Sequence, residues 1–211
     1  MNPMPDLNLR ARFPDASDTY IGFAQKFFRE HQLGTFTEPR FWELIDKARS
    51  VVSNRNSESE NHRLHRKALI TAFSALDIGQ LYDAAEIYWR RYFELNDRKV
   101  WSAIHIVCGC SDDSFMDFRE WVLSQGESAF RAMKDDPDSL PELMIRAGTD
   151  CPFFEGAICG PIWQVFEDRT GGVEIPLLDQ SFTELTGEWI EEVDAQRLFP
   201  KCFAHRNATK S

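Results

Sequence analysis

The sequence predicts an all-α protein: a single compact multi-helix domain with an N-terminal helical extension and an extended, partly irregular C-terminal wrap. Three observations predict this class. Apolar residues recur three to four positions apart along most of the chain, as they do on the buried face of a helix. Residues that favour helix N-termini stand directly before these stretches. We find no alternating run long enough to build a sheet.

Length and composition fit one domain. The 211 residues are 43% hydrophobic and include 17 Phe and 6 Trp, which supply a sizeable core. No apolar run approaches the ~20 residues that span a bilayer, and the N-terminus lacks the apolar middle of a secretory signal. We therefore expect a cytoplasmic protein without membrane association. Its five cysteines lack the paired short spacings of a zinc site, so reduced thiols and no bound metal are expected.

The first half of the chain reads as successive helices joined by short links. Each apolar stretch follows a residue whose side chain can accept hydrogen bonds from a helix N-terminus. Gly34 is expected to end the first helix, and Glu38-Pro39 to begin the second. Ser57-x-x-Glu60 is predicted to form a capping box. The predicted caps are, in chain order, Ser17 or Asp18, Thr37, Ser57, Asp77 and Asp97.

Residues 108–140 carry the densest pattern. Ser111 predicts the N-cap of a helix over residues 112–125, with Asp112 and Asp113 at its first two positions. Carboxylates are favourable there because the helix N-terminus carries partial positive charge. The cap and the dipole together account for these residues structurally, by about 2 kcal/mol.

The second half is more irregular. Asp136 before Pro137 ends the helix that follows Gly126, and Ser139-x-x-Glu142 reads as another capping box. Gly160-Pro161 begins a short helix, after which residues 172–188 read as an extended segment lying over the helices. Asp194 is predicted to cap a last short helix before Pro200.

Charge restricts the functional classes. The net charge is −10, and residues 167–194 hold nine acidic side chains against one basic one. The acidic C-terminal half of the chain repels the phosphate backbone of a nucleic acid, so we expect no nucleic-acid binding. It attracts a basic protein surface. The same charge also fits a solvated face that keeps the protein in solution.

The acids at 112 and 113 support a second interpretation. Asp112 and Asp113 would bind a cation or act as a base, and Arg119 would bind an anion, in a small metal- or anion-binding hydrolase with its site at the N-terminal end of the 112–125 helix. A second ligand motif is missing, and no nucleotide, serine-hydrolase or zinc-protease motif occurs. We therefore predict no cofactor and assign no catalytic residue.

Three segments resemble a bacterial family of unknown function, DUF4240. They are FWELIDKAR (41–49), VWSAIHIVCGCSDDSFMDFREWVLSQGESAFRAMKDDPDSL (100–140) and TGEWIEEVDAQRLFPKCFAHR (186–206). The central block matches the family pattern G-G-C-S-D-D-x-F-x-x-F-R-x-W, with Cys108 where the family tends to have Gly. The resemblance gives residues 36–206 as a DUF4240-like domain, 1–35 as a helical extension and 207–211 as a disordered tail.

The resemblance implies a regulatory or adaptor role, because related domains are joined to tryptophan-glycine-arginine modules in proteins named as regulators. We therefore expect a non-enzymatic interaction module with an acidic docking surface for a basic protein partner, and keep the small hydrolase as the alternative. Residues that match the family pattern supply the candidate ligand or interaction site. These residues are Ser111, Asp112, Asp113, Arg119, Trp121, Asp136 and Asp138.

Overall fold

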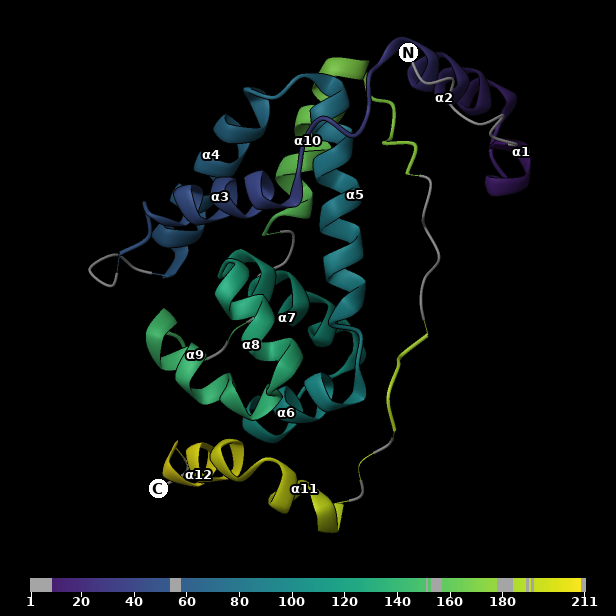
Figure 1. Ribbon diagram of the computed structural model, residues 1–211. Coiled ribbons are helices and arrows are strands. Elements are labelled where there is room, and N and C mark those ends of the chain that lie inside the picture. Colours follow the sequence, from purple (N-terminus) through teal and green to yellow (C-terminus); the bar gives the residue numbers. More distant parts are fainter. Residues whose placement is uncertain are drawn as a thin grey trace.

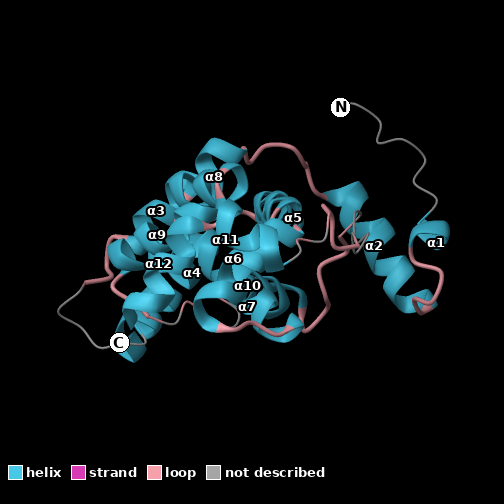
Figure 2. Cartoon of the chain, turned by 90° about the horizontal axis from the view of Figure 1, so that it is seen from below, coloured by secondary structure: helices cyan, strands magenta, loops and turns pink. Residues whose placement is uncertain are grey.

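The computed structural model describes residues 9–53, 58–150, 152, 157–177, 184–188, 190 and 192–209. In these ranges every regular element is helical, which confirms the predicted all-α class (Figures 1 and 2). The helices are α1 (Leu9–Arg12), α2 (Asp18–Glu30), α3 (Glu38–Arg49), α4 (Glu58–Ser74), α5 (Ile78–Glu94), α6 (Arg98–Cys108), α7 (Asp112–Ser124), α8 (Glu127–Asp135), α9 (Leu140–Ala147), α10 (Cys159–Thr170), α11 (Glu192–Leu198) and α12 (Pro200–Thr209), with a 3-10 turn at Pro137–Ser139. Among the described helices, none is both long and apolar enough to cross a membrane.

The long helix α5 runs through the molecule and organises two groups of helices (Figure 1). α10 packs against both α4 and α5, and α3 packs against α4. Beyond the other end of α5 lie α6 to α9, with α12 packed across α6 and α9. The core is therefore continuous from one group to the other, as the apolar periodicity of the sequence requires.

Helix α7 is the buried centre of the second group. Its last seven residues, from Phe118 to Ser124, are all buried. A helix that is buried on every side is normally apolar all round. This one carries Arg119 and Glu120 in the middle of its buried span, and these two side chains need specific compensation.

The N-terminal helix α2 is anchored to the rest of the fold by aromatic packing. Phe27 lies 5.5 Å from the ring of Phe166 on α10 and 5.6 Å from that of Tyr82 on α5. The link after α2 is held by Asp83, whose carboxylate accepts hydrogen bonds from the backbone N–H of Gly34, Thr35 and Phe36 at 2.8–3.0 Å. One buried acid on α5 thus fixes the path between α2 and α3.

The C-terminal segment returns to the link between α5 and α6. Thr186 donates its N–H to Asn96 O and accepts from Arg98 N, both at 3.0 Å, which makes a parallel bridge between Thr186 and Asp97. Arg98 also donates from its side chain to Gly187 O at 2.6 Å. The described parts of the predicted wrap are accordingly non-helical and follow the outside of the bundle (Figure 1).

Most predicted caps are found as expected. Ser17 accepts from Tyr20 N, Asp97 accepts from Lys99 N, and Asp77 forms a full capping box with Gln80. Thr37 stands at the N-cap of α3 without a side-chain hydrogen bond. The predicted box at Ser57 lies outside the described residues.

Three predictions in the second half are corrected. Ser139 makes no cap hydrogen bond, because it belongs to the 3-10 turn that runs directly into α9. Asp194 lies inside α11, where it pairs with Arg197 at 3.0 Å, since the helix begins two residues earlier. The residues 207–209 expected in a disordered tail continue α12, and Thr209 Oγ1 donates to the carbonyl oxygens of His205 and Arg206.

Candidate functional site

The first turn of α7 presents its acids to solvent. Ser111 Oγ accepts a hydrogen bond from Ser114 N at 3.2 Å and so caps the helix as predicted. The side chains of Asp112 and Asp113 follow it in the first turn and are exposed. Met116, one turn further along and 52% exposed, lies on the same side of the helix. This turn is a solvent-facing acidic surface with one apolar residue on it.

Arg119 and Trp121 lie in the core. Trp121 is fully buried and stacks on Phe118, with ring centroids 5.9 Å apart. Arg119 is 6% exposed, and its guanidinium carbon lies 4.0 Å from the ring centroid of Tyr92 and 4.9 Å from that of Phe115. The structure therefore places Arg119 inside the bundle and the Asp112–Asp113 pair on its surface.

Asp136 and Asp138 take different roles although they are two residues apart. Asp136 ends α8 with its backbone N–H bonded to Ala132 O at 2.8 Å, and its side chain is exposed. Asp138 is buried, and its carboxylate accepts from Lys201 N at 3.1 Å and Cys202 N at 3.0 Å. Asp138 thus supplies the N-terminal cap of α12 from a distant part of the chain.

Two further buried acids were missed from the sequence. Besides Asp83, described above, Glu120 accepts from Ile158 N at 3.1 Å and Cys159 N at 3.5 Å, where α10 begins. Burial raises the pKa of Glu120 to about 7, against the opposing effect of these two hydrogen bonds. The available sequence signal was an Arg-Glu pair placed between Phe118 and Trp121 on a helix whose neighbouring residues are mostly apolar.

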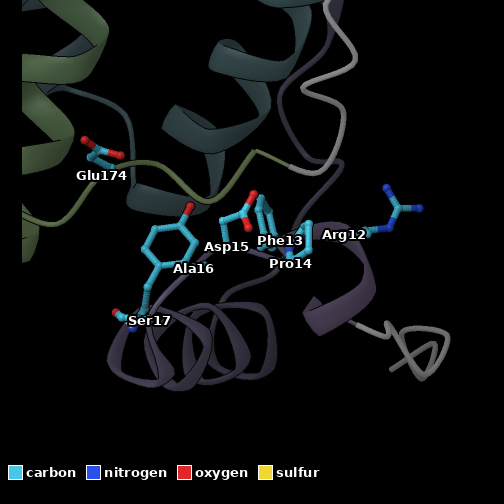
Figure 3. A pocket seen from close by; sticks show the side chains of 8 residues that line it. Arg12, Phe13, Pro14, Asp15, Ala16, Ser17 and Glu174 are labelled. Carbon is cyan, nitrogen blue, oxygen red and sulfur yellow. Dashed lines mark hydrogen bonds between the residues drawn. The ribbon is translucent and has the colours of Figure 1, made fainter.

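A hollow of about 470 Å³ lies away from all of these residues, where the segment before α2 meets the segment after α10 (Figure 3). Its lining residues are Arg12, Phe13, Pro14, Asp15, Ala16, Ser17, Tyr20 and Glu174. Phe13 and Tyr20 form an edge-to-face pair with centroids 5.5 Å apart. Burial, and then the negative charge of Glu174, raise the pKa of Tyr20. In the view of Figure 3 the guanidinium of Arg12 points away from Glu174.

Two of the described thiols, Cys110 and Cys159, are unsuited to nucleophilic chemistry. Burial raises the pKa of Cys110 and that of Cys159 to about 12, so both stay protonated near neutral pH. Within the described ranges no three His, Cys, Asp or Glu side chains are grouped to hold a metal ion. Cys151 lies outside those ranges.

Within the described residues, the fold and the site define an all-helical protein with two buried ionisable side chains, Arg119 and Glu120, in its central helix and an acidic, aromatic hollow at one end. The chain belongs to the family described as Protein of unknown function (DUF4240), whose model matches residues 36–159. The matched span runs from the end of the α2–α3 link to the start of α10, and it leaves α1, α2 and the C-terminal helices outside. No curated protein and no solved structure matches the chain.

Proposed function

We propose that the protein is a non-enzymatic regulatory or adaptor module that docks a basic protein partner on an acidic surface beside α2 and α10. The observation that supports this most is the composition of the hollow in Figure 3. It combines the carboxylates of Asp15 and Glu174 with the rings of Phe13 and Tyr20. Carboxylates and aromatic faces together bind a lysine or arginine side chain, through charge and through cation–π contact.

Against these acids the lining of the hollow holds one basic residue, Arg12, whose guanidinium points away from Glu174 (Figure 3). Asp15, Asp168 and Glu174 are exposed, and none of the ion pairs in the described chain involves them. Arg169 is the one basic residue of the acidic stretch 167–194. It donates to the carbonyl oxygens of Ser74 and Leu76, so its charge is directed at the end of α4. The negative charge of these exposed acids therefore favours a basic partner.

The loop that carries Asp15 is held in place before any partner arrives. Arg10 donates to Ala16 O at 2.6 Å and pairs with Asp18. Ala16 N also donates to Phe13 O at 3.2 Å, which closes a turn through the loop. A site that is already ordered loses less conformational entropy on binding, and this favours recognition over a merely solvated face.

The test is the binding of a fluorescent lysine- and arginine-rich peptide, measured by anisotropy over a range of salt concentrations. The double variant Asp15→Asn, Glu174→Gln keeps the shapes and removes the charges. We expect it to bind about tenfold more weakly, a loss of roughly 1.4 kcal/mol. Binding by the unchanged protein should weaken steadily with salt.

The matched control is Asp112→Asn, Asp113→Asn, which removes two exposed charges from the first turn of α7. This control should bind the peptide as the unchanged protein does, and a double-stranded DNA probe should bind neither. An equal loss of peptide affinity in both double variants would show a general effect of net charge, and the docking surface beside α2 and α10 would then be wrong. A peptide affinity that neither double variant changes and that does not depend on salt would reject an acidic docking surface altogether.

A further inference from the structure

Arg119 is a buried cation without a counter-ion. Its side chain is 6% exposed, and Nε and Nη1 are fully buried and make no hydrogen bond to any residue the structure describes. The ion pairs of the described chain do not include it. Burial lowers the pKa of this guanidinium, yet an arginine stays charged in a protein. The central helix therefore carries an uncompensated positive charge.

Other arginines of the described fold have acceptors for their guanidinium groups. Arg91, one residue before the ring partner Tyr92, pairs with both Glu38 and Glu94. Arg169 donates to two backbone carbonyl oxygens, and Arg49 donates to Gln125 Oε1. The chain thus provides acceptors for its guanidinium groups elsewhere, and Arg119 is the exception in the most deeply buried helix.

Aromatic contact explains only part of this arrangement. The rings of Tyr92 and Phe115 lie against the guanidinium, and Trp101 stacks on Phe115 with centroids 5.6 Å apart. A desolvated cation–π contact offsets only part of the cost of burying an unpaired charge, and the rings leave the N–H groups without acceptors. An acceptor from outside the chain would supply what the fold lacks.

We propose that Arg119 is the anchor of a binding site for the carboxylate of a small apolar acid. The guanidinium presents N–H donors in the geometry that pairs with a planar carboxylate. Trp101, which is only partly buried and stacks on Phe115, offers apolar surface to the body of such a ligand. This site is independent of the acidic docking surface.

Charge balance selects a monoanion. The guanidinium of Arg119 lies against the ring of Tyr92, and the charge of Asp117 acts on the same ring. A carboxylate would neutralise the site, whereas a phosphate dianion would leave an excess negative charge among aromatic rings and near Asp117. Trp101 and Asp117 are only partly buried, so the approach from solvent lies on their side of the cluster.

The experiment compares benzoate with benzamide, its neutral isostere, on the full chain. Thermal unfolding and isothermal titration should show saturable stabilisation by benzoate, a weaker effect of acetate, little effect of inorganic phosphate and none of benzamide. Arg119→Met should bind benzoate at least tenfold more weakly and, without ligand, be no less stable than the unchanged protein. Arg131→Met, which removes an exposed arginine of α8, should behave as the unchanged protein does.

A second measurement covers the case in which Arg119→Met fails to fold. In the unchanged protein, benzoate should shift the side-chain Nε–H resonance of Arg119 in nitrogen-15 spectra, and benzamide should not. Equal responses to the acid and the amide, or an Arg119 resonance that benzoate leaves in place, would overturn the proposal. Preference for phosphate over benzoate would overturn the carboxylate assignment.

Discussion

The carboxylate of Asp138 accepts a hydrogen bond from the backbone N–H of Cys202 at 3.0 Å, although the two residues are 64 positions apart. The same carboxylate accepts from Lys201 N at 3.1 Å. Both N–H groups belong to the first turn of α12, where no helical carbonyl can accept them. A buried acid within the 3-10 turn thus closes the C-terminal helix onto α6 and α9.

Asp138→Ala should lower the free energy of unfolding by about 2 kcal/mol, since it removes a cap and leaves two N–H groups unsatisfied. Urea unfolding followed by tryptophan fluorescence measures the change. Asp138→Asn keeps one acceptor oxygen and should lose roughly half as much. The control Asp136→Asn alters an exposed side chain and should change stability by less than about 0.5 kcal/mol. A control that costs as much as Asp138→Ala would argue against the capping role.

Glu120 gives the fold a pH dependence of its own. Burial raises the pKa of Glu120 to about 7 in the folded protein, while in the unfolded chain it has its ordinary value of 4.5. Between these values the folded state holds a proton that the unfolded state has lost. Stability from this group is therefore full below pH 4.5 and falls by up to ~3 kcal/mol as pH rises to 7. Glu120→Gln should remove this fall in urea titrations across that range.

His65 should produce the opposite slope. It is buried in α4, and its Nε2 makes no hydrogen bond within the described chain. Burial, helped by the charge of Arg49 and by His62, lowers the pKa of His65 from 6.5 to about 4. The unfolded state then binds the proton first, so stability is full above pH 6.5 and is lost by up to ~3 kcal/mol as pH falls to 4. His65→Gln should abolish this loss.

The two slopes oppose each other between pH 4.5 and 6.5, which makes the single variants diagnostic. Glu120→Gln should leave a protein whose stability rises with pH over this interval, because His65 then acts alone. His65→Gln should leave one whose stability falls, because Glu120 acts alone. The double variant should be nearly flat. If both single variants slope in the same direction, at least one of these pKa shifts has the wrong sign.

These acids also show how far the sequence could predict the fold. Ser17, Asp77 and Ser111 cap the helices that directly follow them, so local spacing was enough to predict them. Asp138 and Glu120 cap helices 64 and 38 residues away, and their partners depend on how the bundle closes. Ser139 had the correct spacing for a box, but the preceding turn carries it into helical geometry.

At the candidate site, too, the local features could be predicted and the long-range contacts could not. The pattern around residue 111 predicted the N-terminus of α7 and its exposed acids. It could not predict that α7 becomes the buried centre of the bundle, which is what turns Arg119 from a surface anion binder into a buried, unpaired cation. The hollow beside Glu174 was also out of reach, because it joins a loop near residue 15 to a segment near residue 174. Only tertiary packing brings these together.

Gly126 marks a close approach between α3 and the link from α7 to α8. Its φ is +92°, which disfavours any L side chain, and a Cβ there would lie 2.1 Å from Asp46 Oδ1. Gly126→Ala should therefore cost about 1–2 kcal/mol in urea unfolding, mostly from backbone strain, because the exposed Asp46 side chain can move aside. Adding Asp46→Ala should recover only the smaller, steric part of this loss.

Gly160→Ala is the control. Gly160 lies in α10 with nothing within 4 Å of the added methyl group, so this change should stabilise the protein by up to about 1 kcal/mol. If Gly126→Ala is as harmless as this control, the left-handed conformation at Gly126 is not required by the fold.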